Sequence, residues 1–185
     1  LVWSLTNRCN LSCSYCGLPH LDHAQELRDE KLFGYLSCAI KAGVRILSLT
    51  GGEPLTHPNI EQFMKTCSQN NIAISLNSNG LLINEKMDMI KKHCYEVVIS
   101  WDGIATEHDL SRGKGSSLKA LNALETLKKA GVKTRANCVF TKFTYNRLNE
   151  ILDIANEKKF SVCFQPVWEK TLTYAEHYLQ MEKIQ

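Results

Sequence analysis

The chain of 185 residues is long enough for one domain with a substantial hydrophobic core. Hydrophobic residues make up 44% of the sequence, which is ordinary for a globular protein, and the formal net charge is only +3. No block of lysine and arginine dominates and no apolar run reaches membrane-spanning length, so we expect neither nucleic acid nor a membrane as a partner.

Short apolar, β-branched runs alternate with longer helical patterns along the chain. Strands are predicted at residues 2–5, 45–50, 72–77, 96–101, 132–140 and 161–167. Helices are predicted at residues 30–42, 59–70, 85–93, 117–130, 146–158 and 172–183. Repeated strand–helix units favour parallel strands joined by right-handed crossovers, either as an open barrel or as a doubly wound sheet.

Three cysteines lie close together near the amino terminus: Cys9, Cys13 and Cys16, with the spacing C-x3-C-x2-C. They place three thiolates in one loop after the first predicted strand, with no local fourth ligand. A structural zinc site and an electron-transfer cubane each require four ligands, whereas three thiolates suit a four-iron cluster with one open iron. An open iron can bind a substrate or cofactor. From these cysteines alone, a zinc or ferredoxin-type site with a distant fourth ligand remains the alternative.

The other five cysteines are scattered singly: Cys38, Cys67, Cys94, Cys138 and Cys163. We expect the first three of these to lie in helices and to pack as small apolar residues. Because no second C-x-x-C pair occurs, we expect no further iron–sulfur cluster in this segment. The pattern fits a reducing compartment, so a cytoplasmic location is predicted.

The triplet, with Tyr15 just before its last cysteine, resembles that of the radical S-adenosylmethionine (radical SAM) enzymes. Residues 50–54, Thr-Gly-Gly-Glu-Pro, look like the family's Gly-Gly-Glu-Pro segment, and residues 75–80 and 97–103 follow in the family's usual order. The resemblance favours an α/β fold, a partial (β/α)6 TIM-like barrel with parallel strands. Residues 1–185 are then a radical SAM core domain, and the start at Leu1 suggests a segment of a longer protein.

The resemblance implies that the three cysteines hold a [4Fe-4S] cluster whose open iron binds S-adenosylmethionine. Reductive cleavage then yields methionine and a 5′-deoxyadenosyl radical that abstracts hydrogen from a substrate, which is a peptide, a cofactor precursor or a small metabolite. An external flavodoxin or ferredoxin is the expected electron donor. The sequence identifies neither the substrate nor a catalytic residue that acts on it.

Further cofactor contacts are expected at the carboxyl ends of the predicted strands, the edge where barrel active sites form. By resemblance, residues 51–54 (Gly51, Gly52, Glu53 and Pro54) contact the ammonium group of the cofactor, and Tyr15 packs beside its adenine. An ordinary tight turn that starts the next helical region is the alternative for residues 51–54.

Hydroxyl and guanidinium groups near the same edge are suited to the cofactor's ribose and carboxylate. Ser78 and Ser100 can donate hydrogen bonds, and Arg112 can bind a carboxylate through two nitrogens. We expect Arg112 and Ser100 to contribute to cofactor binding rather than to folding. A surface-loop arginine is the alternative for Arg112.

Asn79 and Asp102 end predicted strands at this edge, where each could also cap a turn. Asn137 lies within a predicted strand and, by resemblance, contacts the ribose. Gln165, in the last predicted strand, could face the barrel interior and contact a substrate.

Two functional alternatives remain: a non-catalytic metal-binding module and an iron–sulfur electron-transfer module. The Gly-Gly-Glu-Pro segment argues against the first, because a zinc site needs no cofactor-binding turn. The repeated strand–helix units argue against the second, because a simple electron-transfer protein does not need them.

Overall fold

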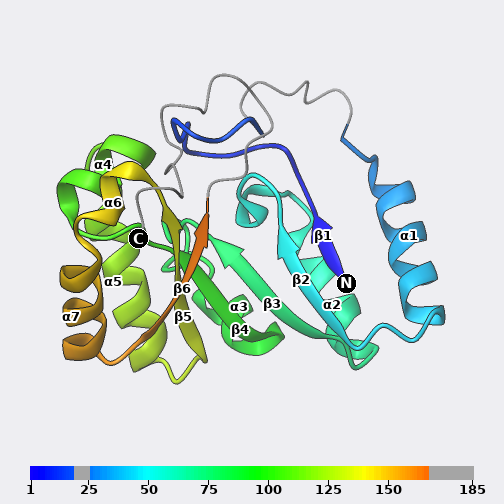
Figure 1. Cartoon of the computed structure of the whole chain (residues 1–185). Coiled ribbons are helices and arrows are strands. Elements are labelled where there is room, and N and C mark those ends of the chain that lie inside the picture. Colours follow the sequence, from blue (N-terminus) through cyan, green and yellow to red (C-terminus); the bar gives the residue numbers. More distant parts are fainter. Residues whose placement is uncertain (19–25, 167–185) are drawn as a thin grey trace.

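The computed structural model of the chain describes residues 1–18 and 26–166, which are built on one parallel sheet (Figure 1). Its strands pair in chain order: β1 (Val2–Ser4), β2 (Ile46–Thr50), β3 (Ala73–Ser78), β4 (Cys94–Ser100), β5 (Thr134–Phe140) and β6 (Ser161–Pro166). Within the described residues β1 and β6 do not pair with each other, so the sheet is an open, partial barrel. The predicted α/β class with parallel strands is confirmed.

Helices connect the strands and cover one face of the sheet. Those expected from the sequence are α1 (Asp29–Lys41), α2 (Ile60–Gln69), α3 (Met87–His93), α5 (Ser116–Lys129) and α7 (Leu148–Lys158). The helix expected at residues 172–183 lies outside the described residues. No helix in the described ranges is long and apolar enough to cross a membrane.

Three short helical segments differ from the expectation: the 3-10 helix η3 (Pro54–Thr56), α4 (Ala105–Arg112) and α6 (Lys142–Tyr145). Helix α4 lacks the apolar stripe by which amphipathic helices are recognised. It buries the polar side chains of His108, Ser111 and Arg112, whereas its Leu110 is 62% exposed. The sequence pattern therefore gives no signal for this helix.

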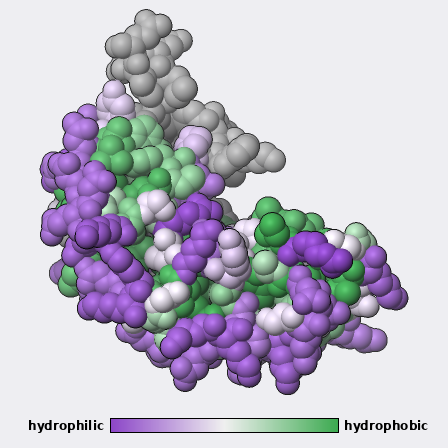
Figure 2. Space-filling model, turned by 90° about the horizontal axis from the view of Figure 1, so that it is seen from below, coloured by the Kyte–Doolittle hydropathy of each residue, from purple (hydrophilic) through white to green (hydrophobic). Residues whose placement is uncertain are grey.

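The sheet separates an apolar face from a more polar one. Leu49 of β2 pairs in register with Leu76 of β3, and both are fully buried in the main core with Phe63 of α2. Because side chains alternate along a strand, Ser48 and Asn77 point to the opposite, half-buried face. Seen from below, the molecule curves around a hollowed side where hydrophilic and hydrophobic residues meet (Figure 2).

The scattered cysteines only partly follow the expectation. Cys67 of α2 is buried as predicted, but Cys38 of α1 is exposed. Cys94 is not helical, because α3 ends at His93 and Cys94 begins β4. All eight cysteines are free thiols.

The cysteine loop is attached to the loop after β2 by backbone hydrogen bonds. The β1–β2 pairing continues past the strand ends, with Leu5 N donating to Thr50 O (2.8 Å) and Gly52 N to Thr6 O (2.7 Å). Glu53 N then donates to Arg8 O (2.8 Å). A Cβ atom on Gly52 would overlap the backbone carbonyl of Arg8, so only glycine permits this approach.

We expect Gly52→Ala to destabilise the fold, because its methyl group would meet the Arg8 backbone rather than a mobile side chain. Overpacking of this kind typically costs about 1–3 kcal/mol in the free energy of unfolding. Chemical denaturation measures it. Gly34→Ala is the matched control, because Gly34 lies in α1 with open space around it. Equal stability of the two variants would contradict this account of the loop contact.

Candidate functional site

A hollow of about 140 Å³ opens at the carboxyl edge of the strands, and all three cysteines of the loop line it. The expected site residues that line the same hollow are Cys9, Cys13, Cys16, Tyr15, Gly51, Gly52, Ser78, Asn79, Ser100 and Arg112. Ligand pockets usually measure about 300–1,000 Å³, so a nucleoside-sized ligand bound here would extend beyond the hollow.

The donor set of the hollow fits a multi-iron cluster. Three thiols surround one space, but in the described part of the chain no three His, Cys, Asp or Glu side chains are close enough to hold a single metal ion. A cubane instead spreads its thiolates over different irons. Burial raises the pKa of Cys13 to about 11, so iron binding would have to displace its proton.

Glu53 lies beneath the hollow rather than in its lining. The carboxylate is fully buried and accepts hydrogen bonds from Leu55 N (3.2 Å), Ser78 Oγ (3.1 Å) and Asn79 N (2.7 Å). Burial raises the pKa of Glu53 to about 7, against the opposing effect of these bonds. The carboxylate thus joins the turn after β2 to the end of β3, and Pro54 behind it is also buried.

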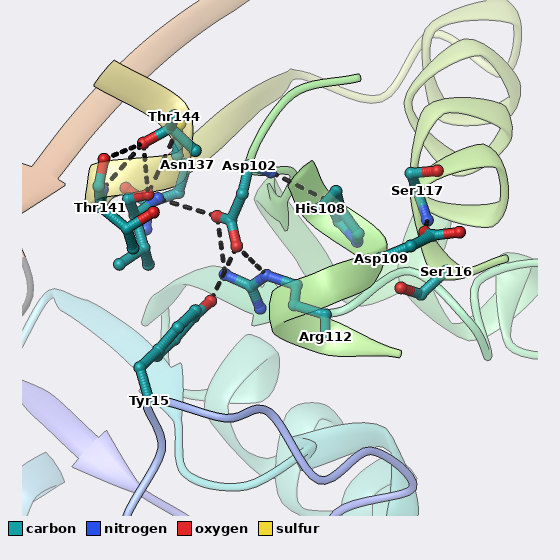
Figure 3. Close-up of polar contacts among 12 residues, drawn as sticks. Tyr15, Asp102, His108, Asp109, Arg112, Ser116, Ser117, Asn137, Thr141 and Thr144 are labelled. Carbon is teal, nitrogen blue, oxygen red and sulfur yellow. Dashed lines mark hydrogen bonds and ion pairs between the residues drawn. The ribbon is translucent and has the colours of Figure 1, made fainter. Parts of the chain in front are cut away.

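Asp102 is a second buried carboxylate, and it lies at the centre of the polar contacts in Figure 3. Its Oδ2 accepts hydrogen bonds from Arg112 Nε (2.5 Å) and Tyr15 OH (2.8 Å). Its Oδ1 accepts from Arg112 Nη2 (3.0 Å) and Val139 N (2.8 Å). One carboxylate therefore connects the cysteine loop, α4 and β5.

Charge compensation keeps this buried pair ionised. Burial acts to raise the pKa of Asp102, but the charge and hydrogen bonds of Arg112 outweigh burial and lower it. Burial likewise acts to lower the pKa of Arg112, and the charge of Asp102 holds it above its usual value. The guanidinium also lies over the Tyr15 ring, 5.4 Å from the centroid. Arg112 is therefore a buried residue of an ion pair. The surface-loop alternative is wrong, and so is the expectation that Arg112 has no part in the folded structure.

The residues around Arg112 fix the end of α4. His108 is buried and its Nδ1 accepts the Asp102 N–H (3.0 Å), while burial lowers its pKa to about 4 and keeps the ring neutral. The Asp109 carboxylate accepts from Ser117 N (2.9 Å) and Gly115 N at the start of α5. These bonds place Arg112 beside the hollow.

Asn79 does more than cap a turn. Its Oδ1 accepts from Leu81 N (3.0 Å), as a turn cap would, but its Nδ2 donates to Asn10 Oδ1 (2.7 Å) and approaches Cys9 Sγ at 3.9 Å. If Cys9 ligates a cluster, an amide donor this close to its sulfur is one of the features that would set the cluster potential.

Asn137 lies on the open face of the sheet, outside the lining of the hollow. It is opposite Ser100 in the β4–β5 register, and its Nδ2 donates to Gln165 Oε1 (2.8 Å). Both amides are therefore on the face toward which the hollow opens.

Sequence reasoning missed four lining residues: Leu11, Leu18, Thr50 and Asn77. Leu11 lies within the cysteine triplet and Thr50 directly precedes Gly51. Their position next to motif residues could therefore have identified them as lining residues. Asn77 is signalled by strand alternation, since it lies two residues before Asn79. Leu18 offers no such signal.

Comparisons with known proteins agree with this arrangement. A GTP 3',8-cyclase from Clostridium botulinum (strain Okra / Type B1) is 27% identical over 194 residues, covering 98% of this chain and 61% of that protein. An Fe-coproporphyrin III synthase from Methanosarcina barkeri (strain Fusaro / DSM 804) is 26% identical, covering 89% and 43%. The chain thus spans less than two thirds of these relatives.

Solved structures show the same fold. Native anSMEcpe with bound AdoMet superposes with a TM-score of 0.80 at 26% identity, covering 95% of this chain and 54% of that one. Streptococcus suis SuiB bound to S-adenosylmethionine gives a TM-score of 0.81 at 23% identity, a likeness in fold, covering 93% and 41%. The model of the Radical SAM superfamily matches residues 3–155, most of the sequence, and the chain therefore belongs to the Radical SAM superfamily.

Proposed function

We propose that this chain is the core of a radical SAM enzyme. Its Cys9, Cys13 and Cys16 hold a [4Fe-4S] cluster, and the hollow beside them receives S-adenosylmethionine. When bound, cluster and cofactor together supply reductive cleavage to methionine and a 5′-deoxyadenosyl radical, which abstracts hydrogen from the substrate. The observation that carries the proposal is the gathering of three thiols around one hollow at the carboxyl edge of a parallel sheet, in a chain of this superfamily.

Different residues of the hollow are proposed to contact different groups of the cofactor. Ser78 and Ser100 offer hydroxyl donors, and the backbone of Gly51 and Gly52 comes close because neither carries a side chain. Arg112 lines the hollow and is the group proposed to attract the carboxylate of the cofactor, although Asp102 already binds its Nε and Nη2; Asp102 and Glu53 support the lining from beneath. Asn137 is available to a ribose that extends over the open face.

The substrate is proposed only as a class: a peptide, a cofactor precursor or a small metabolite. Relatives with this core are named for different chemistry, as a GTP cyclase, a coproporphyrin synthase and a protein bound to a precursor peptide. Radical SAM enzymes need a reductant, and we propose a flavodoxin or ferredoxin in the cytoplasm. Eight free thiols are compatible with that reducing compartment.

Replacing Cys9, Cys13 and Cys16 together by Ala is expected to abolish the iron-dependent absorbance after anaerobic reconstitution, because the cluster would lose its ligands. A double variant of the exposed Cys38 and Cys163 is the matched control and should load iron normally. Retention of a full cluster by the triple variant would make the ligand assignment wrong.

Adding S-adenosylmethionine to the reduced, reconstituted protein is expected to change the electron paramagnetic resonance signal of the cluster, since one iron has no cysteine ligand. The same protein titrated with buffer that contains no S-adenosylmethionine is the control. An unchanged signal at saturating cofactor would favour an electron-transfer module instead.

Arg112→Ala is expected to reduce stability, contrary to the role in binding alone that the sequence suggested. It would leave Asp102 buried without its ion-pair partner, a change that typically costs about 3–5 kcal/mol in the free energy of unfolding. Chemical denaturation of the protein before cluster loading measures this. Arg45→Ala is the control, because Arg45 is exposed. Equal stability of both variants would return Arg112 to a role in binding only.

A further inference from the structure

Asn79 brings an amide donor to the first cysteine of the loop. Its Nδ2 approaches Cys9 Sγ at 3.9 Å, within the range of a hydrogen bond to sulfur. The same nitrogen donates to Asn10 Oδ1 at 2.7 Å. Because an amide nitrogen carries two hydrogens, each of these acceptors can receive one of them.

The orientation of the Asn79 amide is fixed by its other contacts. Its Oδ1 accepts a hydrogen bond from Leu81 N (3.0 Å), so the nitrogen rather than the oxygen is turned toward Cys9. The backbone N–H of Asn79 donates to the buried Glu53 carboxylate (2.7 Å), and the residue is only 8% exposed. The protein therefore holds this donor in place by itself, through bonds that do not involve a cluster.

A second hollow, of about 410 Å³, lies next to this contact, between the turn after β3 and helix α5. Cys9 and Asn79 line the first hollow, and their neighbours in sequence, Asn10 and Gly80, line the second. The bond between Asn79 and Asn10 thus lies between the two hollows, and breaking it would let water approach the Cys9 sulfur from the second. Solvent exposure and hydrogen bonds to sulfur both influence the potential of a cluster, so the two effects have to be separated.

We infer that Asn79 raises the reduction potential of the cluster by donating a hydrogen bond to the Cys9 thiolate. The inference rests on the proposed function. On reduction the oxidised cluster gains one electron from the external donor, and no bond forms or breaks. The added negative charge is shared with the ligating sulfurs, and an N–H group directed at one of them stabilises it. Asn79 acts through Cys9 and makes reduction of the cluster more favourable.

The test measures the midpoint potential of the reconstituted cluster without S-adenosylmethionine, by a redox titration followed by electron paramagnetic resonance. Asn79→Ala is expected to lower the ratio of reduced to oxidised cluster about tenfold at a fixed potential, as suits the loss of one hydrogen bond to a charged group. For a one-electron couple this moves the midpoint by about 59 mV to more negative values. An unchanged midpoint would overturn the inference.

Asn10→Ala is the matched control. It breaks the same bond between Asn79 and Asn10 and opens the same side of Cys9 to water, but it leaves the Asn79 amide, which Leu81 N still holds. The midpoint should therefore not become more negative in this variant. Equal negative shifts in the two variants would overturn the inference, because they would trace the effect to the loop contact or to water rather than to the donor.

A second pair of variants decides the question if Asn79→Ala does not hold a cluster. Asn79→Asp keeps an acceptor for Leu81 N but removes the donor, whereas Asn10→Asp adds the same charge beside Cys9 and keeps the donor. The larger negative shift is expected for Asn79→Asp, and equal shifts would contradict the inference. If the unsubstituted protein forms no cluster, the proposed function fails and the inference fails with it. A cluster that forms but does not respond to Asn79 refutes the inference alone.

Discussion

The site depends on the backbone hydrogen bonds that carry the β1–β2 pairing beyond the ends of the strands. Through them the cysteine loop lies directly against the Gly51–Gly52 turn. The two backbones are so close that no Cβ atom would fit between them. The bonds fix main-chain atoms rather than flexible side chains, so the start of the loop is set by the sheet itself. The position of the proposed cluster site is thereby coupled to the pairing of an edge strand only three residues long.

Side chains hold the loop at further points. Glu26 accepts hydrogen bonds from Thr6 Oγ1 (2.5 Å) and Asn7 N (2.7 Å), before the first cysteine. Asp102 holds Tyr15 before the last one. Between them, Asn79 contacts Asn10 beside Cys9. Cys9 and Cys16 therefore each have an anchored neighbour, and preorganisation of this kind lowers the cost of arranging ligands around a cluster.

The buried carboxylates of Asp102 and Glu53 hold many of the residues around the hollow. The cost of burying each carboxylate is offset by a different kind of partner. Asp102 is paired with a buried guanidinium, which favours its charged form, whereas Glu53 has only neutral donors and its pKa rises to about 7. Burial acts to raise the pKa of both carboxylates, but only Asp102 has a charged partner that outweighs it, so the net pKa shifts have opposite directions. Both carboxylates lie outside the lining of the hollow and act through the residues that they hold.

The sequence by itself determined the parallel α/β fold, most helices and the grouping of the cysteines with the Gly-Gly-Glu-Pro turn. These depend on local periodicity and on motif spacing, which a linear sequence records directly. It could not determine that α4 exists, because this helix buries polar side chains, which leave no apolar periodicity and are stabilised by hydrogen bonds to Asp102 just after β4. Nor could it show that Arg112 is bound to Asp102, or that a second hollow lies behind Cys9 and Asn79. Those features arise only where separate strand ends meet, so tertiary structure alone decided them.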